Sequence, residues 1–231
     1  MPTLTIFAGV NGAGKTSLYN EISKNMYAED MGIRVCADEV LKALNLDWSN
    51  GEDQARSGKE TAKLLRYCLD NRLSFNWELT IITPFILNKI KQAHALGYTI
   101  NLYFIGVENV TLSLKRIKKR MLLGGHGVDE ALVRTRHELQ FDYLYEALQY
   151  VNCAFFYDNL NHIDLVGTYF SNNLEIIDET SWIKRFNNGI YSTNNNFTER
   201  YQEAFKRAIE EVNKNLQTTI KSEHTNKKNT D

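Results

Sequence analysis

Short apolar runs alternate with helix-like stretches along the first two thirds of the chain. The runs are rich in aliphatic, β-branched and aromatic residues, which is typical of buried strands. Between them, residues 16–27 and 85–96 are compatible with helices, and the second stops at Gly97. This alternation predicts a mostly parallel sheet covered by helices on both faces, with ligands at the carboxyl ends of the strands. The predicted strands are residues 4–8, 32–37, 73–77, 98–105 and 151–157.

The pattern changes after residue 159. Residues 163–170 and 174–177 predict a hairpin, and the asparagine-rich residues 187–196 predict a loop or linker. Apolar residues then recur at helical spacing, after a possible cap pair at Asn196 and Glu199. Such a helix either docks on the core or binds a partner, and amphipathicity alone does not decide between them. The helical positions are Tyr201, Ala204, Phe205, Ala208, Ile209, Val212 and Leu216.

Residues 9–16 read GVNGAGKT and complete the pattern GxxxxGK[ST] directly after the first predicted strand. The glycines let successive N–H groups point at phosphate oxygens, Lys15 reaches the β- and γ-phosphates, and the Thr16 hydroxyl suits Mg²⁺. A helix-compatible segment follows, so bound phosphates would lie at a helix N-terminus. The sequence predicts nucleotide triphosphate binding on the three-layer α/β sandwich of P-loop NTPases. The predicted nucleotide-binding residues are Gly9, Val10, Asn11, Gly12, Ala13, Gly14, Lys15, Thr16 and Ser17.

Composition narrows the class of protein. The 231 residues are 43% hydrophobic and 24% charged, enough for one sizeable globular core. A formal net charge of -1 gives no indication of a nucleic-acid or membrane partner. Cys36, Cys68 and Cys153 are odd in number and lack CxxC spacing, which favours core positions over disulfides or structural zinc. Because no signal segment or membrane-length apolar run is present, we expect a cytoplasmic protein.

Two acidic residues follow predicted strands. Asp38 follows the second, where a carboxylate can act as general base or order Mg²⁺, although capping of a helix at residues 39–44 explains it equally well. Glu78 follows the third, with Thr80 close by, where it can organise Mg²⁺ or bind substrate hydroxyls. For Glu78 the alternative is a solvated side chain that opens a loop.

A basic stretch covers residues 115–136 around a glycine-rich turn. Phosphoryl transfer needs positive groups over the developing charge, and the planar fork of arginine can hold two phosphate oxygens at once. Arg120 and Arg136 are the candidates for this role. The neighbouring lysines, Lys115, Lys118 and Lys119, fit the solvated face of a helix.

Other interpretations of the same stretch are weaker. His126 has no second His or Cys at ligand spacing, so we expect a structural role in the turn rather than metal binding. RNA binding is disfavoured because aromatic residues are not interleaved with the basic ones.

Over residues 3–159 the chain resembles the zeta toxin family of P-loop kinases. The Arg-x3-Arg-x3-Gly-Gly-His block is the most discriminating part, since a generic P-loop enzyme has no reason to carry it at this distance from the loop. The matching blocks are GVNGAGKTS at 9–17, Ala37-Asp38-Glu39, SFNWELT at 74–80, Gly97-Tyr98, Arg116-x3-Arg120-x3-Gly124-Gly125-His126, Arg134-Thr135-Arg136 and Tyr157-Asp158-Asn159.

The resemblance implies an ATP-dependent kinase that phosphorylates a sugar hydroxyl of a nucleotide sugar, the family's known substrate being UDP-N-acetylglucosamine. It implies ATP and Mg²⁺ as cofactors and a small antitoxin that blocks the ATP site. Asp38 is then the general base, and Glu78 and Thr80 lie with it on the acceptor side. The other implied roles are phosphate and Mg²⁺ binding for Lys15 and Thr16, charge neutralisation for Arg120 and Arg136, and the adenine side for Arg116 and Asn159.

Departures from the family pattern leave the acceptor open. Leu79 replaces one hydroxyl of a Glu-Thr-Thr pattern, Asp129 stands in place of proline, and Leu160 in place of serine. No antitoxin-like bundle precedes the phosphate loop, so we expect either that any antitoxin is a separate chain or that this member is a housekeeping kinase that needs none. The alternatives are a kinase for another nucleotide, nucleoside or aminosugar, and an ATP-dependent switch with slow hydrolysis.

The domain organisation follows from these observations. We expect a P-loop kinase domain over residues 1–186, which includes the hairpin, and a linker with the C-terminal helix over residues 187–221. Residues 222–231 are polar and are expected to be a disordered tail.

Overall fold

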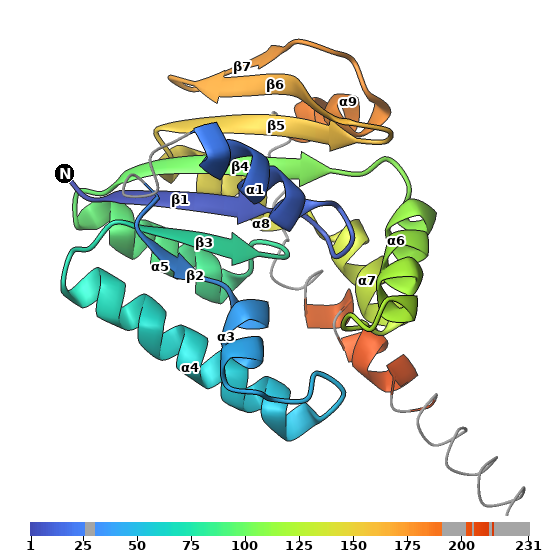
Figure 1. Ribbon diagram of the computed structural model, residues 1–231. Coiled ribbons are helices and arrows are strands. Elements are labelled where there is room, and N and C mark those ends of the chain that lie inside the picture. Colours follow the sequence, from blue (N-terminus) through green and yellow to red (C-terminus); the bar gives the residue numbers. More distant parts are fainter. Residues whose placement is uncertain (26–30, 191–201, 205, 213, 215–231) are drawn as a thin grey trace, which may run out of the picture.

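The computed structural model describes residues 1–25, 31–190, 202–204, 206–212 and 214. Its strands are β1 (Thr3–Ala8), β2 (Ile33–Val35), β3 (Phe75–Leu79), β4 (Thr99–Gly106), β5 (Cys153–Asn159), β6 (Ile163–Phe170) and β7 (Asn173–Ile176). They form one sheet in the order β2-β3-β1-β4-β5-β6-β7 (Figure 1). The first five strands run parallel, and β6 and β7 are antiparallel additions.

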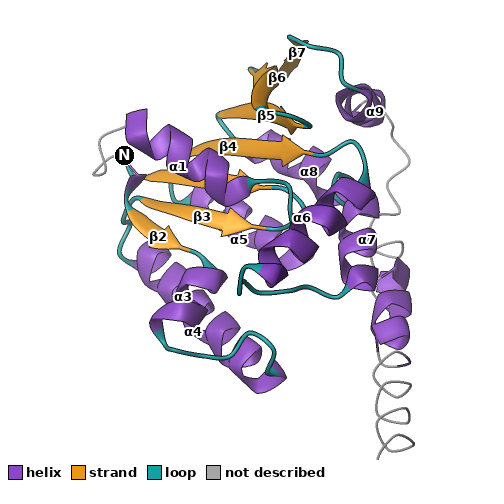
Figure 2. Ribbon diagram, turned by 45° about the vertical axis from the view of Figure 1, so that its right-hand side comes forward, coloured by secondary structure: helices purple, strands orange, loops and turns teal. Residues whose placement is uncertain are grey.

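Helices cover both faces of this sheet (Figure 2). On one face, α4, α5, α8 and α9 share an apolar core with the strands. On the other face, α1 packs on β1 and β4 through Leu18, Phe7 and Ile105. The helices are α1 (Lys15–Asn25), α3 (Ala37–Ala43), α4 (Gly51–Asp70), α5 (Pro84–Ala95), α6 (Val110–Leu122), α7 (Glu130–Glu138), α8 (Asp142–Ala147), the 3₁₀ helix η1 (Leu148–Tyr150) and α9 (Ser181–Ile190). The predicted α/β sandwich with a mostly parallel sheet is confirmed.

The predicted hairpin is also confirmed. Strands β6 and β7 pair antiparallel from Gly167 with Ile176 to Phe170 with Asn173. Ser171 and Asn172 join them with φ of 50° and 61°. Two central residues with positive φ define a type I′ turn, whose twist matches that of the flanking strands.

Several element boundaries differ from the sequence prediction. Strand β3 ends two residues later than predicted, at Leu79, so Glu78 lies within the strand and is not an exposed residue opening a loop. Strand β2 ends at Val35 rather than at residue 37, and α3 begins at Ala37. The 20-residue helix α4 was not predicted, because its buried apolar residues are confined to its last two turns.

The C-terminal predictions are tested only in part. Helix α9 continues to Ile190, so residues 187–190 are helical and the predicted loop does not begin at residue 187. The described residues of the last predicted helix are helical, with Ala204 and Ala208 buried and Ile209 exposed against expectation. Residues 191–196, the Asn196 and Glu199 cap pair, Tyr201, Phe205, Leu216 and the predicted tail lie outside the described residues.

Two further observations bear on the composition. In the described part of the chain, no helix combines the length and the apolar character needed to cross a membrane. The three cysteines are free thiols, with Cys36 and Cys68 buried as expected and Cys153 only partly so.

Candidate nucleotide and phosphoryl-transfer site

The predicted phosphate loop connects β1 to α1 at the carboxyl edge of the sheet. Gly12 and Gly14 adopt φ of 78° and 111°, a backbone region that residues other than glycine rarely adopt. A Cβ at Gly14 would also lie 2.4 Å from Asn159 Nδ2. The curled loop holds the ammonium of Lys15, which donates to the carbonyl oxygens of Gly9 at 2.9 Å and Val10 at 3.2 Å.

The ammonium of Lys15 lies in an electrostatically mixed environment. Burial lowers the pKa of Lys15 from its ordinary value, and the carboxylates of Glu78 and Asp38 only partly oppose this shift. The buried ammonium of Lys15 has lost part of its hydration. The negative charge of a phosphate group beside it would compensate for that loss. The loop is therefore built to gain from an anionic ligand.

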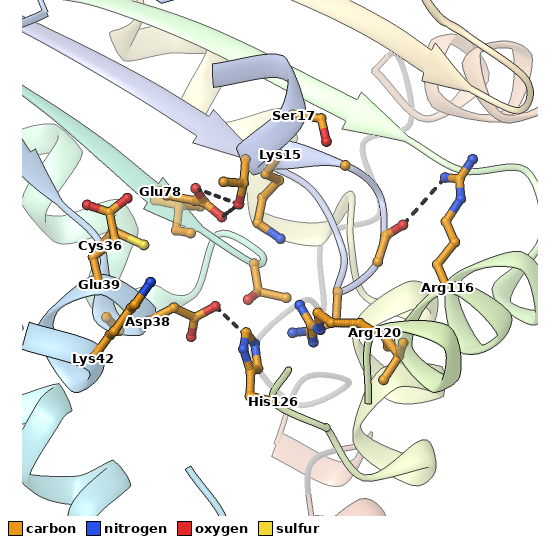
Figure 3. A pocket seen from close by; sticks show the side chains of 18 of the residues that line it. Lys15, Ser17, Cys36, Asp38, Glu39, Lys42, Glu78, Arg116, Arg120 and His126 are labelled. Carbon is orange, nitrogen blue, oxygen red and sulfur yellow. Dashed lines mark hydrogen bonds and ion pairs between the residues drawn. The ribbon is translucent and has the colours of Figure 1, made fainter. Parts of the chain in front are cut away.

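A cavity of about 760 Å³ opens beside the phosphate loop (Figure 3). Most of the residues predicted from the sequence line it, although they come from separate elements. Gly9, Val10 and Ala13 instead lie buried in the loop, and Arg136 is not among the residues that line the cavity. The predicted residues on the cavity wall are Asn11, Gly12, Gly14, Lys15, Thr16, Ser17, Asp38, Glu78, Thr80, Arg116, Arg120 and Asn159.

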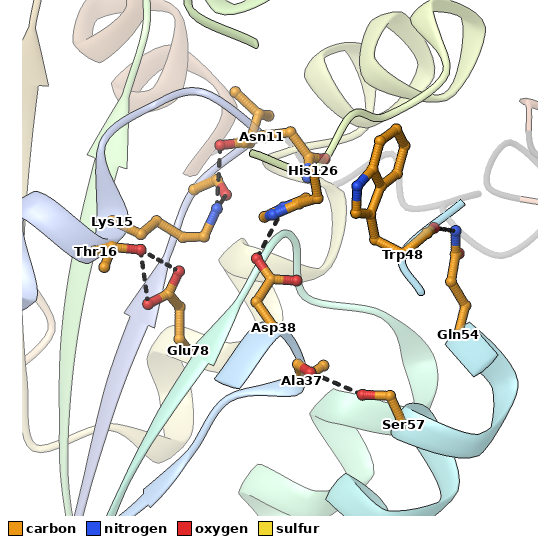
Figure 4. A network of polar contacts seen from close by, with 12 residues as sticks. Asn11, Lys15, Thr16, Ala37, Asp38, Trp48, Gln54, Ser57, Glu78 and His126 are labelled. Atoms are coloured by element: carbon orange, nitrogen blue, oxygen red, sulfur yellow. Dashed lines mark hydrogen bonds and ion pairs between the residues drawn. The ribbon is translucent and has the colours of Figure 1, made fainter. Parts of the chain in front are cut away.

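Asp38 lies in the first turn of α3 and does not cap it. The N-cap position is Cys36, and no side chain caps the helix. The Oδ2 atom of Asp38 instead lies 3.0 Å from Nε2 of His126, across the cavity (Figure 4). Burial raises the pKa of Asp38, but the hydrogen bond from His126 and the positive charges of His126, Lys15 and Arg120 outweigh burial and lower it. Asp38 is thus held as a carboxylate, and the capping interpretation is wrong.

Glu78 is fixed from two sides. Its carboxylate accepts a hydrogen bond from the Thr16 hydroxyl at 3.1 Å to Oε1, and its Oε2 pairs with Arg34. The Glu78 side chain is only 8% exposed, so the solvated alternative is wrong. A hydroxyl and a carboxylate at this spacing, beside the phosphate loop, are the oxygen ligands that Mg²⁺ prefers, directly or through water.

Two arginines, Arg120 and Arg136, lie beside the phosphate loop and make different contacts. Arg120 lines the cavity, and its Nε and Nη2 are buried without a hydrogen-bond partner among the described residues. Arg136 donates from Nη1 to Oδ1 of Asn11 at 2.8 Å. Since unpaired buried donors are costly, the two nitrogens of Arg120 could donate to a ligand with acceptor oxygens in this cavity.

Arg116 and Asn159 brace the phosphate loop at Gly12 and Ala13. Arg116 donates from Nη2 to the backbone oxygen of Asn159 at 2.7 Å and from Nη1 to that of Gly12 at 3.4 Å. Asn159 in turn donates from Nδ2 to the carbonyl oxygen of Ala13 at 2.7 Å. Both side chains therefore stabilise the backbone of the phosphate loop through hydrogen bonds.

Sequence reasoning missed several residues of the site. His126 was expected to serve only the turn, yet it contacts Asp38, and Arg34 was not considered although it pairs with Glu78. Lys42 and Cys36 also line the cavity. Lys42 follows Asp38 by one helical turn, which was a usable signal. No signal marked Arg34, because its partner is 44 residues away in sequence.

The structure also shows the surroundings of the lysines and of Asp129 in the basic stretch. Lys115, Lys118 and Lys119 are exposed on α6, as expected. Asp129, which stands in place of the family's proline, caps α7 by accepting from the N–H of Ala131 at 2.8 Å. This departure from the family pattern therefore has a local structural explanation.

The sheet order, the phosphate loop and the cavity together define an α/β fold of the P-loop kinase type. The family model for zeta toxin matches residues 1–196. This chain therefore belongs to the zeta toxin family, and the match extends beyond residue 159, where the sequence motifs end.

Individual relatives are distant. An uncharacterized protein of Haemophilus influenzae is 26% identical over 131 residues, which is 57% of this chain and 89% of that protein. The structure is similar to one from the PezAT chromosomal toxin-antitoxin system of Streptococcus pneumoniae, with a TM-score of 0.53 and 15% identity over 91% of this chain and 87% of that chain.

Crystal structures of the AvrRxo1-ORF1:AvrRxo1-ORF2 complex are also similar. The form with ATP has a TM-score of 0.54 and 11% identity over 90% of this chain and 76% of that chain. In the form with sulphate ions the TM-score is 0.56 at 13% identity, over 80% of this chain, and the match spans 64% of that chain. At these identities the similarity concerns the fold.

Proposed function

We propose that this protein is an ATP-dependent kinase that transfers the γ-phosphoryl group to a sugar hydroxyl of a nucleotide sugar of the UDP-N-acetylglucosamine type. We further propose that it is the toxin of a toxin-antitoxin pair. The observation that carries the kinase proposal is the convergence of Lys15, Asp38 and Arg120 on one cavity beside the phosphate loop. A binding protein needs the loop, but it has no need for a carboxylate held opposite it.

The roles follow from position and charge. The loop amides and Lys15 would hold the β- and γ-phosphates of ATP. Oδ2 of Asp38 is engaged by His126, which leaves Oδ1 to accept the proton of the acceptor hydroxyl as its oxygen bonds to phosphorus and the bond to ADP breaks. The unpaired nitrogens of Arg120 fit the oxygens of the transferring group, and Arg136 would add charge from the Asn11 side.

The residues present fit a magnesium ion. Thr16 and Glu78 would hold it, directly or through water, since their oxygens lie together at the phosphate end of the cavity. When bound, the ion would neutralise phosphate charge. Arg34 pairs with Oε2 of the same Glu78 carboxylate that accepts from Thr16, and so limits its orientation.

The acceptor end of the cavity lies near α3. Glu39 and Lys42 from α3, with Thr80 after β3, add polar groups to this wall, which suits a hydroxylated and charged acceptor. The ATP-containing AvrRxo1-ORF1:AvrRxo1-ORF2 structure and the PezAT toxin-antitoxin system have the same fold, which supports ATP as donor and an antitoxin as partner. We propose that such an antitoxin is a separate chain.

The acceptor is identified by mass spectrometry of reactions with ATP, Mg²⁺ and a panel of UDP-sugars, nucleosides and aminosugars. We expect the mass of one phosphate to be added to UDP-N-acetylglucosamine. If only a nucleoside or a free aminosugar gained a phosphate, the proposal of kinase activity would stand and the proposed acceptor would be wrong. No product with any acceptor, despite measurable ATP binding, would favour an ATP-dependent switch.

A further inference from the structure

The turn between α6 and α7 makes three separate contacts through three consecutive residues, two of them with the cavity residues Arg120 and Asp38. Gly125 donates from its backbone N–H to the Arg120 carbonyl oxygen at 2.9 Å, and a Cβ on Gly125 would lie 2.5 Å from Cγ of Arg120. His126 reaches Asp38 (Figure 4). A Cβ on Gly127 would lie 3.3 Å from Cη2 of Trp48, so the indole ring lies against the turn.

We propose that this turn, residues 124–127, is a clasp that fixes the position of Asp38 relative to Arg120, with His126 as the positioning residue for Asp38. The inference rests on the proposed kinase function and deepens it. The spacing of the basic block then has a structural reason, because Gly125 lies against the side chain of Arg120 and the next residue, His126, reaches the Asp38 carboxylate.

Asp38 needs such a partner because its own helix holds it weakly. Helix α3 has seven residues, and none of them is buried. Its tie to α4 is a hydrogen bond from the Ser57 hydroxyl to the Ala37 carbonyl oxygen at 2.7 Å, which fixes the backbone but not the Asp38 side chain. That side chain is 59% exposed. The contact with His126 therefore selects its orientation.

His126 contributes to the geometry of Asp38 and does not itself transfer a proton in this proposal. A reacting group that is displaced by about 1 Å loses roughly 10²-fold in rate, so a base on a short exposed helix gains from an external contact. The imidazole engages Oδ2 and leaves the other oxygen of Asp38 available. The same turn lies against the side chain of Arg120, so one segment contacts both the base and the arginine.

The kinetic test compares His126→Leu with His126→Gln, using ATP and UDP-N-acetylglucosamine. We expect turnover to fall roughly 10²-fold in His126→Leu, with ATP affinity changed less than about twofold. His126→Gln should recover most of the rate, because its amide nitrogen can donate at a similar reach. His94→Leu, an exposed histidine at the end of α5, is the matched control and should keep its rate.

A double variant separates positioning from independent catalysis. Asp38→Ala combined with His126→Leu should be no slower than Asp38→Ala alone, because a residue that acts through another has no effect once that residue is gone. A further loss in the double variant, or an unchanged rate in His126→Leu, would overturn the proposal.

A measurement without any acceptor distinguishes failure of the clasp from failure of the kinase proposal. Trp48, Trp77 and Trp182 are the chain's three tryptophans, and Trp77 and Trp182 are buried in the apolar core between the sheet and its helices. In protein labelled with 5-fluorotryptophan, His126→Leu and Asp38→Ala should each shift the fluorine signal of Trp48 and leave the other two in place. An unmoved Trp48 signal would overturn the clasp even if the kinase were active. A shift of the Trp48 signal in both variants, with no transfer to any acceptor by the wild type, would support the clasp and contradict the proposed kinase function.

Discussion

Arg34 and Glu78 form an ion pair between adjacent strands, with side chains 12% and 8% exposed. Arg34 also donates to Glu39 and to Asn76, both at 2.9 Å, and its guanidinium lies 3.6 Å from the centre of the Tyr19 ring. One guanidinium thus joins β2, β3, α1 and α3 beneath the cavity. Glu78 reaches Thr16 from this fixed position, so the pair sets the geometry of the phosphate end.

Removal of Arg34 should therefore be costly. Breaking a largely buried pair leaves Glu78 charged and uncompensated, so we expect Arg34→Met to lower the free energy of unfolding by about 3 kcal/mol. Urea denaturation measures this change. Arg134→Met removes an exposed i,i+4 pair with Glu130 and should change the free energy of unfolding far less, because solvent screens exposed pairs. Equal effects of the two variants would contradict the structural role of Arg34.

The pH dependence of stability tests the contact between Asp38 and His126. Although burial raises the pKa of Asp38, His126, Lys15 and Arg120 together lower it below the ordinary 3.8. The unfolded chain then binds more protons between the lowered pKa and 3.8, so stability rises with pH across that window. The contribution is complete above 3.8 and is lost as the pH falls through the folded value.

The measurement is the difference in unfolding free energy between wild type and Asp38→Asn, followed from about pH 6 to about pH 3. We expect this difference to shrink at the acid end, and to vary less in a His126→Leu background. A difference that stays constant over the range in wild type would show that the Asp38 carboxylate is not stabilised as the structure indicates.

Asn159 tests the brace of the phosphate loop. Its side chain supports the Ala13 carbonyl oxygen and lies beside the Arg116 fork. A lost hydrogen bond of this kind costs roughly 1–3 kcal/mol, so Asn159→Ala should weaken ATP binding about tenfold or more. Calorimetric titration measures this affinity. Asn161→Ala, an exposed neighbour, is the control. If both variants bind ATP alike, Asn159 is no brace.

Arg136 tests the neutralisation of the transferring group. An arginine over a transferring phosphoryl group is worth on the order of 10³ in turnover, so Arg136→Ala should lose about that factor. Arg134→Ala changes an exposed arginine of the same helix and should retain the wild-type rate. A near wild-type rate in Arg136→Ala would limit Arg136 to its hydrogen bond with Asn11.

The sequence predicted the parallel sheet and the phosphate loop because both depend on local patterns. Apolar runs of strand length and the glycine spacing of residues 9–16 are visible without tertiary information. Most of the site residues were also predicted, because they follow strands whose carboxyl ends meet at one edge. The described structure brings Asp38, Glu78 and Arg120 to one cavity.

Long-range partners were beyond the sequence. Whether Asp38 caps a helix or faces the cavity depends on where α3 begins, and its start at Ala37, two residues before the predicted start, is not fixed by propensity. The pairing of Arg34 with Glu78 and of His126 with Asp38 arises from tertiary packing. Helix α4 was missed because its first three turns bury Ser57 but no apolar side chain.

The most direct test of the account is the rate of γ-phosphoryl transfer from ATP to UDP-N-acetylglucosamine by wild type and by Asp38→Asn, with ATP affinity measured on both. Asp70→Asn, an exposed aspartate at the end of α4, is the matched control. We expect transfer by wild type and by the control, and loss of transfer in Asp38→Asn with ATP affinity nearly unchanged. Transfer by Asp38→Asn at the wild-type rate would contradict the assignment of Asp38 as the general base.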